Sequence, residues 1–520
     1  MNEKLKTLPI GTYNFEKLRR MNCVYVDKTA RLMELVEAGA WYFLSRPRRF
    51  GKSLTLSTLD ALFGGKAELF RGLAAEAWAA EQAKHPAPVL RLDMSMMDTR
   101  GVSEFEASLI RELTRRAESA GVHVKSILPG GVFQDLIIGL YDQGGPVVVL
   151  IDEYDKPILD KIGNLEAAEA MREALRTLYT VLKGCDEYLR FVMLTGISKF
   201  TKTGVFSAMN NLMDISMTER FGDVVGYTQE ELERDFAGWI DDAAGKMRLS
   251  RQELLMQMKD YYDGFCFDGT TRLYNPFSIL NFFFNSRFSN YWYESGSPSF
   301  IVAYMKRHDI LDPEAYRHLV VKESFASSQE IERARPESFL YQAGYLTIEK
   351  WEEQSLTLDY PNREVLDSIA GMYLEHVYNV ERYDSIGSDL WRALSEGDVA
   401  RGVQLYNTAL ASIPYQDLAR RDESLYRSLF LMLLRGAGIT AHGEVPTNRG
   451  RSDVLVLFPH RVVVLEFKLA RSEGEIARLQ TEGQRQIEEK GYTKPFDADR
   501  RAVTSAVVVV DLQKHEATAC

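Results

Sequence analysis

The sequence has little cysteine and no long apolar run. Its four cysteines lie far apart and form no metal-ligand spacing, so we expect free thiols in a reducing compartment. They are Cys23, Cys185, Cys266 and Cys520. Residues 1–22 lack the apolar core of a signal peptide, and no run approaches the ~20 apolar residues of a membrane span. We therefore expect a cytoplasmic protein without a membrane partner.

An excess of positive charge is also missing. The 520 residues include 63 Lys and Arg against 74 Asp and Glu, which gives a net charge of −11. This balance argues against a protein that coats nucleic acid by bulk charge, although it leaves room for a local basic groove. The hydrophobic fraction of 45% and the charged fraction of 26% are ordinary for a soluble globular protein, and the length suggests about two to four domains.

Strand and helix signals alternate over residues 1–226, which predicts an α/β domain with a parallel sheet. The run Val147–Ile151 is apolar throughout, as in a central parallel strand. Helix signals cover Ser53–Phe63 and Leu165–Lys183, the second with Asn164 as its N-cap. We expect the other strands at Trp41–Leu44, Val89–Met94 and Tyr188–Leu194.

The pattern changes after this domain. Residues 227–300 contain helix signals and many aromatic side chains, which favours a helical or winged-helix-like lid with an aromatic core. Stacking of these rings on nucleic-acid bases is the alternative. We expect a mostly helical linker region at 301–410. Residues 411–520 follow the order helix, three strands, helix, strand, which predicts a second α/β domain.

The tripeptide Gly51-Lys52-Ser53 lies between a predicted strand and a predicted helix, where it indicates a phosphate-binding loop. Free N–H groups and the positive dipole end at a helix N-terminus bind phosphates. We expect Lys52 to reach the β- and γ-phosphates of ATP and the Ser53 hydroxyl to bind Mg²⁺. The usual first glycine of such a loop is replaced by Arg46, and the following Pro47 has no N–H to offer.

Two further strand ends supply polar partners for this loop. The apolar strand that begins at Val147 ends in two carboxylates, Asp152 and Glu153. We expect Asp152 to hold the Mg²⁺ shell and Glu153 to orient or deprotonate the attacking water. Thr195 or Ser198, at the next strand end, would sense the γ-phosphate. A capped turn is the alternative interpretation of that last segment.

A second acidic cluster is predicted near the C-terminus. Asp453 begins one strand, and Glu466 and Lys468 lie two apart on the next strand, so the latter two share a face. If the strands pair as a hairpin, Asp453 meets Glu466, and both can bind Mg²⁺, with Glu423 as a third metal ligand and Glu444 as a further candidate. Lys468 would activate water or stabilise charge on a phosphate. The alternative is an exposed strand face with a Glu–Lys pair.

Two basic clusters accompany these candidate sites. Arg46, Arg48 and Arg49 belong to the phosphate loop, and we expect Arg48 and Arg49 to bind the nucleotide together with the Gly-Lys-Ser tripeptide. The second cluster surrounds the C-terminal acids and suits a nucleic-acid groove, although solvated arginines on a polar face are the alternative. It consists of Arg449, Arg451, Arg461, Lys468 and Arg471.

Several long segments resemble the bacterial AAA-ATPase-like family: "SRPRRFGKSLTLSTL", "VVVLIDEYDKP", "LTGISKFTKTGVFSAMNNLMDIS", "YYDGFCF" and "LYNPFSILNFF" with "YWYESGSPSF". The family usually carries a C-terminal PD-(D/E)XK nuclease-superfamily domain, and "GRSDVLVL" followed by "VVVLEFKLA" keeps the positions that this superfamily needs. The resemblance implies a restriction-endonuclease-like C-terminal fold and an additional-strand P-loop fold. In the latter, one strand separates the phosphate-loop strand from the acidic strand. The resemblance also makes the missing glycine of the phosphate loop a family trait. Gln486 and Tyr492 resemble the helix Gln and the Tyr of the superfamily's exonuclease-like branch.

These observations leave three functional hypotheses. The leading one is an ATP-binding, ATP-hydrolysing protein coupled to a Mg²⁺-dependent nuclease that acts on nucleic acid, with DNA favoured over RNA. The second is a regulatory ATP switch that binds a partner without cleaving nucleic acid. The third, an ATP-driven translocase, lacks a helicase-like motif series. The sequence leaves open whether the chain forms a homo-oligomer, which polymer it cleaves and which pathway it serves.

Overall fold

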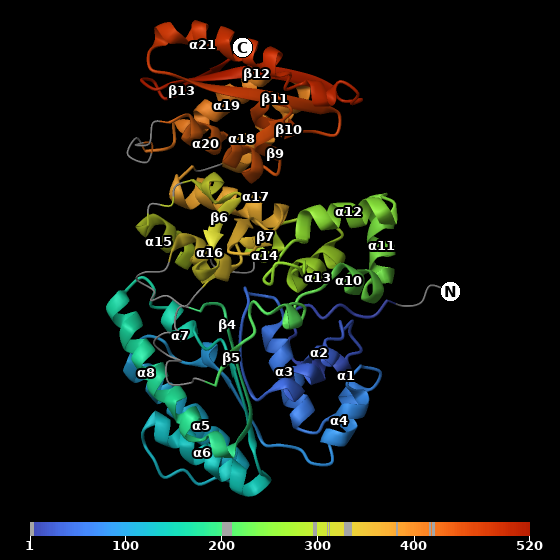
Figure 1. The fold of residues 1–520 in the computed structure, drawn as a ribbon, viewed down its shortest axis with the longest axis vertical. Coiled ribbons are helices and arrows are strands. Elements are labelled where there is room, and N and C mark those ends of the chain that lie inside the picture. The colour runs from blue at the N-terminus through green and yellow to red at the C-terminus, as the bar shows by residue number, and fades with distance from the viewer. Residues whose placement is uncertain are drawn as a thin grey trace. The chain divides into compact units, whose positions relative to one another are not determined.

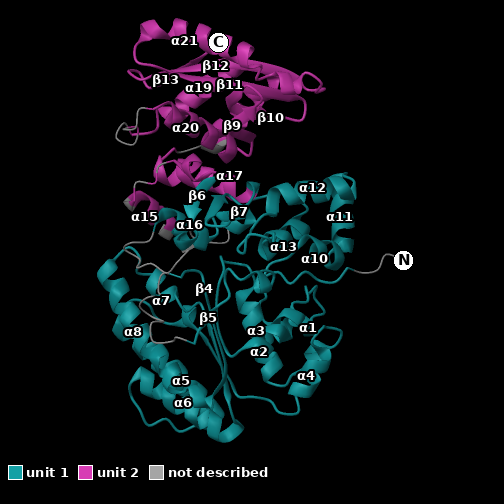
Figure 2. Cartoon of the chain, viewed as in Figure 1, with its two compact units in different colours: residues 1–300, 318–363 teal, residues 301–317, 364–520 magenta. Residues whose placement is uncertain are grey.

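The computed structural model describes residues 5–199, 211–294, 299–308, 310, 312–326, 335–380, 383–414, 418 and 422–520. The chain divides into two compact units (Figure 2): unit 1 comprises residues 1–300 and 318–363, and unit 2 comprises residues 301–317 and 364–520. Parts of two motifs, residues 200–210 and 295–298, lie outside the described residues. The finer division into four domains stays a prediction.

Unit 1 contains a five-stranded parallel sheet in the order β2-β3-β4-β1-β5. Strand β4 lies between β1, which precedes the phosphate loop, and β3, which ends in the acidic pair. The additional strand implied by the family resemblance is therefore confirmed. The strands are β1 (Trp41–Ser45), β2 (Val89–Asp93), β3 (Val147–Asp152), β4 (Leu189–Gly196) and β5 (Met213–Asp214).

Helices cover both faces of this sheet, with α1 to α4 on one side and α5 to α8 on the other (Figure 1). All six residues of β3 are buried, as its continuous apolar run predicts for a strand covered on both faces. Helix α8 begins after the predicted N-cap Asn164, whose side chain accepts a hydrogen bond from the N–H of Ala167. The helices are α1 (Phe15–Arg20), α2 (Thr29–Ala38), α3 (Lys52–Phe63), α4 (Glu76–Gln82), α5 (Val102–Ala120), α6 (Pro129–Gly144), α7 (Lys156–Leu159) and α8 (Leu165–Gly184).

The region predicted as a lid forms a helical group within unit 1. Its apolar core includes Tyr262, Phe282 and Phe283, which are fully buried and pack with Val24 and Val26 of the N-terminal segment. These rings serve as core, so burial removes them from any role in stacking on bases. The helices are α10 (Gln229–Asp235), α11 (Ala237–Met247), α12 (Arg251–Tyr262), α13 (Pro276–Asn285) and α14 (Tyr291–Glu294).

The range expected to be mostly helical also contains a small antiparallel sheet, which the sequence analysis missed. Its strand order is β6-β8-β7, and helix α16 (Pro336–Ala343) precedes β7. The strands are short and carry charged side chains, so their alternation is a weak signal. They are β6 (Leu319–Lys322), β7 (Thr347–Glu352) and β8 (Ser355–Asp359).

Unit 2 is built on a five-stranded mixed sheet in the order β13-β12-β11-β10-β9, in which only the β11–β12 pair is parallel. The predicted order of helix, three strands, helix and strand is present, and β13 adds an edge strand that was not predicted. The strands are β9 (Thr440–Thr447), β10 (Gly450–Leu457), β11 (Arg461–Ala470), β12 (Ala502–Asp511) and β13 (Glu516–Ala519). The helices are α15 (Ser299–Arg307), α17 (Arg363–Met372), α18 (Tyr383–Glu396), α19 (Val399–Leu410), α20 (Glu423–Gly436) and α21 (Ile476–Lys490).

The cysteines and the apolarity of the helices bear on two expectations from composition. All four cysteines are free thiols, and only Cys520 is exposed. None of the helices in the described ranges combines the length and apolarity that a bilayer crossing requires.

Candidate functional site

A cavity of about 520 Å³ in unit 1 opens beside the phosphate loop. Arg48, Arg49, Gly51, Lys52 and Ser53 line it, together with Glu153. Gly51 has a φ of +101°, a conformation that favours glycine, and it caps helix α3. Many of its other lining side chains are apolar or aromatic, which suits a ligand that joins a flat ring to a charged group. They are Ile10, Tyr13, Val24, Val26, Tyr227, Phe277 and Leu280.

The Lys52 side chain lies within the loop itself. Its ammonium donates hydrogen bonds to the carbonyls of Arg46 and Pro47, each at 2.8 Å. Burial lowers the pKa of Lys52 to about 8. Two neutral carbonyls are weaker partners for an ammonium than an anionic oxygen. The loop therefore fits a phosphate group, to which Lys52 could transfer these bonds.

Arg46, which replaces the usual glycine, points into the core and not into the cavity. Its guanidinium donates to the carbonyl of Ser216 and lies 4.4 Å from the centre of the Phe267 ring. Phe267 also packs edge-on against Phe50 of the loop, as does Phe265. The "YYDGFCF" motif, which has no evident role in the sequence, therefore supports the phosphate loop from behind.

The backbone of the loop is held by the lid region as well. The carbonyl of Arg48 accepts hydrogen bonds from the side chains of Asn275 (3.4 Å) and Trp292 (3.2 Å). Gly344 approaches Pro47 so closely that a Cβ atom at position 344 would lie 2.6 Å from the proline Cβ. These contacts fix a loop that has lost one glycine and one N–H.

The acidic pair at the end of β3 divides into a buried and a cavity-lining residue. Asp152 is buried, and its Oδ1 accepts a hydrogen bond from the Thr195 hydroxyl at 2.7 Å. Glu153 lines the cavity with a φ of +49°, which is strained for a residue other than glycine. Burial raises the pKa of Glu153, while the nearby Lys52 opposes that shift. A carboxylate held in this way is suited to accept a proton from water.

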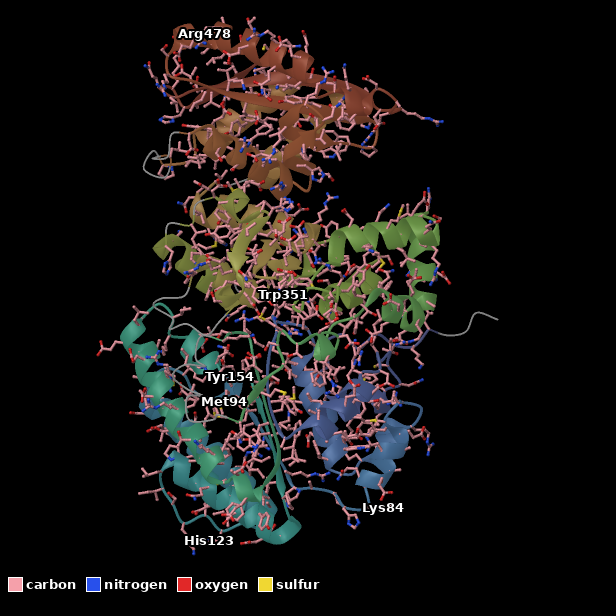
Figure 3. The ribbon with its side chains drawn as sticks, in the orientation of Figure 1. Lys84, Met94, His123, Tyr154, Trp351 and Arg478 are labelled. Atoms are coloured by element: carbon pink, nitrogen blue, oxygen red, sulfur yellow. The ribbon has the colours of Figure 1, made fainter. Side chains whose placement is uncertain are left out.

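Asp155 was missed by the sequence analysis, and it organises the end of β4. Its Oδ2 accepts hydrogen bonds from the N–H groups of Ile197 and Ser198 and from the Ser198 hydroxyl, at 3.1, 2.6 and 2.7 Å. Tyr154, labelled in Figure 3, donates its hydroxyl proton to the Ser198 carbonyl at 2.7 Å. Ser198 could contact a phosphate only by giving up its bond to Asp155. Thr195 and Ser198 do not line the described cavity, so their predicted sensing role stays a prediction.

Asp93 is a second acid that the sequence analysis missed. It ends β2 directly opposite Asp152 in the parallel ladder, and its side chain lines the same cavity as Glu153. Its Oδ1 accepts hydrogen bonds from the N–H and the hydroxyl of Ser95 at 2.9 and 2.6 Å. The signal was present, because an acid at the carboxyl end of a strand next to β3 meets the same edge of the sheet.

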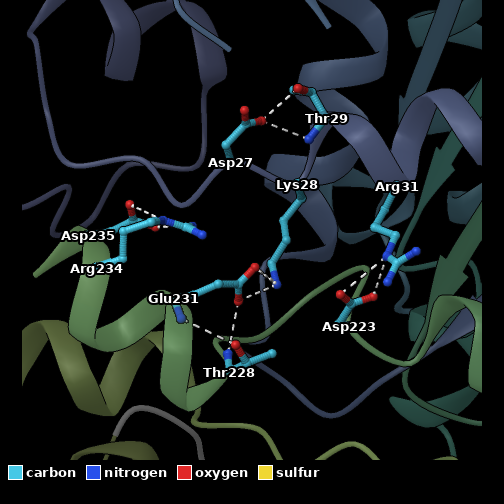
Figure 4. Close-up of polar contacts among 9 residues, drawn as sticks. All are labelled: Asp27, Lys28, Thr29, Arg31, Asp223, Thr228, Glu231, Arg234 and Asp235. Carbon is cyan, nitrogen blue, oxygen red and sulfur yellow. Dashed lines mark hydrogen bonds and ion pairs between the residues drawn. The ribbon is translucent and has the colours of Figure 1, made fainter. Parts of the chain in front are cut away.

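Ion pairs join the N-terminal segment to residues 223 and 231 (Figure 4). Lys28, which lines the cavity, pairs with Glu231 at 2.6 Å, and both side chains are nearly buried. Glu231 also forms a capping box with Thr228 at the start of α10. Arg31 pairs with Asp223 at 2.9 Å. The Lys28–Glu231 pair thus ties a cavity-lining side chain to the start of α10.

In unit 2, the strand ladders are interrupted on both sides of Asp453. The β10–β11 ladder ends at the pair Val454–Leu465, so Asp453 and Glu466 are the next residues opposite each other. The β9–β10 ladder also skips Asp453, where Glu444 has a φ of +50°. Such irregularities redirect side chains at functional edges of sheets. The hairpin expected from the sequence is confirmed, and it brings the two acids together.

The side chains of these acids are held in a dense polar cluster. Asp453 Oδ2 accepts a hydrogen bond from the N–H of Phe467 at 2.8 Å, and Glu466 Oε1 lies 2.6 Å from Lys468 Nζ. Burial and the neighbouring Asp453 raise the pKa of Glu466 to about 7. Burial alone would lower the pKa of Lys468, but its pairing with Glu466 and the nearby acids raise it. Burial and the nearby charge of Asp453 also raise the pKa of Glu423, at the start of α20.

Arg427 is the main member of this cluster that the sequence analysis missed. It lies one turn after Glu423 on α20, and its Nη1 donates to Asp453 Oδ1 at 3.0 Å. Its Nη2 donates to Glu444 Oε1 at 2.6 Å. The i to i+4 spacing on a predicted helix was an available signal, since it places Arg427 on the face of Glu423.

The donor set suits a hard divalent cation such as Mg²⁺. Glu466 Oε2 is buried and accepts no hydrogen bond from the described residues. A buried carboxylate oxygen without a partner is costly unless a cation binds it. Carboxylate oxygens of Asp453, Glu466 and Glu423 are the ligands that Mg²⁺ prefers. These residues therefore fit such an ion.

The basic groove stays a prediction, and two of its expected members have other partners. Arg461 is not at the site, because it lies at the opposite end of β11 and donates to the Ser395 carbonyl and the Thr504 hydroxyl. Lys468 is paired with Glu466. Gln486 Nε2 lies 3.3 Å from the Tyr492 hydroxyl, so these two residues contact each other.

Two family models match the chain. One, described as a predicted AAA-ATPase, matches residues 9–206, and the other, described as the PD-(D/E)XK nuclease superfamily, matches residues 421–518. A curated protein of Azotobacter chroococcum mcd 1, described as an uncharacterized protein in the vnfD 5′ region, is 35% identical over 507 residues. The alignment covers 95% of this chain and 94% of that protein.

Two solved structures from Aeropyrum pernix show a weak likeness. The ORC1 protein in complex with DNA is 10% identical with a TM-score of 0.25, covering 66% of this chain and 92% of that one. The ORC2 protein in ADPNP–ADP complexes is 14% identical with a TM-score of 0.26, covering 85% and 89%. Scores this low carry no argument about ligands or partners.

Proposed function

The chain belongs to the AAA-ATPase-like proteins that carry a C-terminal PD-(D/E)XK nuclease-superfamily domain, and on that premise we propose that it couples ATP hydrolysis in unit 1 to Mg²⁺-dependent cleavage of nucleic acid in unit 2. DNA is favoured over RNA as the substrate. The cytoplasm is the proposed compartment, in keeping with four free thiols. Self-association into a homo-oligomer stays a prediction.

One observation carries the nuclease proposal. Asp453, Glu466 and Lys468 converge where the strand ladders are interrupted, and Glu466 presents a buried oxygen to which no described residue donates a hydrogen bond. A bound divalent ion would supply charge stabilisation on a phosphate and a more acidic water. In this scheme Asp453, Glu466 and Glu423 hold the ion, and Lys468 steadies the charge that develops on the phosphate.

The residues of unit 1 support a nucleotide role. Lys52 would exchange its two carbonyl partners for phosphate oxygens, and Ser53 and Asp152 would share the Mg²⁺ shell. Arg48 and Arg49 line the same cavity and add positive charge. Glu153, held by a strained backbone beside Lys52, would orient and deprotonate the attacking water.

The test is incubation of the purified full-length protein with single- and double-stranded DNA and RNA, with Mg²⁺ or Mn²⁺, with and without ATP. We expect metal-dependent cleavage that chelation abolishes and that ATP alters. Cleavage that is insensitive to ATP would uncouple the two activities. An absence of cleavage on every polymer, together with ATP binding, would contradict the nuclease proposal.

A regulatory ATP switch that cleaves nothing is the second candidate. The phosphate loop favours it, because Arg46 replaces the usual glycine, Pro47 lacks an N–H, and the carbonyls of these two residues already accept hydrogen bonds from Lys52. The net charge of −11 also weakens general affinity for nucleic acid. Nucleic-acid-independent ATP turnover without any nuclease activity would support this candidate.

A further inference from the structure

We propose that Arg427 is a further functional residue of the unit 2 site: it neutralises Asp453 in the metal-free protein and contacts a phosphate of the nucleic acid once a divalent ion binds Asp453. The inference rests on the proposed nuclease function. It extends that function to a residue outside the acidic and lysine positions that the family pattern contains.

The position of Arg427 on its helix brings it to the acids. Helix α20 presents Glu423 and Arg427 one turn apart on the same face, and both meet the cluster around Asp453. The Arg427 side chain is only 13% exposed, so it forms a wall of the site and not a solvated surface charge. Its two outer nitrogens bind two different carboxylates, Asp453 and Glu444.

The charges in the site are matched in pairs. Arg427 neutralises Asp453, and Lys468 neutralises Glu466, at 3.0 and 2.6 Å. A divalent ion between Asp453 and Glu466 would bring the same two positive charges to the same two acids. The ion would then repel the Arg427 guanidinium and would itself neutralise the Asp453 carboxylate.

The released guanidinium suits a phosphate. An arginine side chain is planar and stays charged, and its donors match two oxygens of a phosphate. The bond from Nη2 to Glu444, at 2.6 Å, would keep the side chain at the rim of the site. Arg427 therefore needs only to turn its Nη1 side from Asp453 to the substrate.

The test compares Mn²⁺ affinity with cleavage in the full-length variant Arg427→Met. Mn²⁺ is titrated into metal-free protein by calorimetry, and cleavage of a supercoiled plasmid is followed with saturating Mn²⁺. Because the competitor for Asp453 is gone, we expect Mn²⁺ to bind roughly three- to tenfold more tightly. Because a phosphate contact is also gone, we expect the cleavage rate to fall about 100-fold.

Arg451→Met is the matched control for metal affinity. Arg451 is 69% exposed and pairs with Glu444 at 3.3 Å, so its loss changes the local charge without freeing Asp453. Its Mn²⁺ affinity should equal that of the wild type. A purely structural ion pair at Arg427 would predict weaker or unchanged Mn²⁺ binding together with unchanged cleavage, and that result would overturn the inference.

Arg427→Lys keeps the inference testable if Arg427→Met does not fold. Lysine retains the charge but not the planar fork, so Mn²⁺ affinity should stay at the wild-type value while cleavage falls about tenfold. Full cleavage by this variant would overturn the inference. Wild-type protein that neither binds Mn²⁺ nor cleaves the plasmid would overturn the proposed nuclease function itself.

Discussion

The two candidate sites each contain a buried lysine, and the two lysines differ in their partners. Lys52 in unit 1 donates to two backbone carbonyls, and burial lowers its pKa to about 8. Lys468 in unit 2 is paired with Glu466, and the acids around it raise its pKa in spite of burial. The first site is therefore short of negative charge, and the second has an excess of acid.

This difference indicates what each site is built to receive. An under-neutralised ammonium at a helix N-terminus is suited to an anion such as a phosphate chain. A buried carboxylate oxygen that accepts no hydrogen bond, as at Glu466 among the residues described, is suited to a cation. One chain thus holds an anion site and a cation site, and their independence can be tested.

The largest effect is expected for Asp453→Ala, which should separate the two sites completely. Cleavage should fall by more than about 100-fold, the upper end of the loss seen when a residue that merely supports a metal ligand is changed. ATP affinity should stay unchanged, because Asp453 belongs to unit 2 and the nucleotide cavity to unit 1. The measurements are metal-dependent plasmid cleavage and ATP titration calorimetry. Chelation should mimic the variant, and wild-type cleavage rates in Asp453→Ala would point to another site.

Glu153→Gln should break catalysis in unit 1 while preserving binding. The amide keeps the shape of the side chain but cannot accept a proton, so ATP turnover should fall by about 100-fold or more. ATP affinity should stay near the wild-type value. Steady-state phosphate release and calorimetry check the two expectations. Unchanged turnover would remove Glu153 from the proposed mechanism.

Lys52→Ala should weaken ATP binding, whereas Glu153→Gln should slow ATP turnover. Loss of charge-assisted bonds to phosphate should weaken ATP binding roughly 30- to 100-fold. The matched control is Lys156→Ala, since Lys156 also lines the cavity but pairs with Asp160. Its ATP affinity should change less than about tenfold. Equal ATP affinity in Lys52→Ala and wild type would reject the assigned phosphate loop.

The smallest effect concerns pH and the metal-free protein. The raised pKa of Glu466, about 7 against 4.5 for a free side chain, means that the folded state holds this proton more tightly than the unfolded state. This group therefore lowers the free energy of unfolding as pH rises from about 4.5 to about 7. Glu466→Gln should remove that loss. The free energy of unfolding of the variant should therefore exceed that of wild type by roughly 1–3 kcal/mol at pH 8 and by almost nothing at pH 4. Urea unfolding of chelator-treated protein checks this, and a pH-independent difference would contradict it.

The sequence predicted those features of the fold and of the site that neighbouring residues determine. The apolar run of β3, the strand Ala502–Asp511 and the cap at Asn164 all appear as expected, because burial and capping act on neighbouring residues. The phosphate loop and the hairpin that joins Asp453 to Glu466 follow from the order of strands, turns and acids.

The missed features depend on contacts between distant residues. Asp155 binds the N–H groups that follow β4, and Arg427 binds an acid two strands away. Local spacing places Arg427 on the face of Glu423, but it does not specify the distant partner Asp453. The small sheet β6-β8-β7 forms from short strands whose charged side chains hide their alternation. The interior position of Arg46 likewise depends on Ser216 and Phe267, which are remote in sequence.

The buried Arg46 has a consequence for how such loops evolve. A single Arg46→Gly change would not restore an ordinary glycine-rich loop, because it would leave the Ser216 carbonyl without its donor and the Phe267 ring beside an empty space. The arginine and its surroundings must change together, so intermediates between the two loop types are expected to be less stable than either. Sequence searches that demand the usual glycine spacing would pass over chains of this kind.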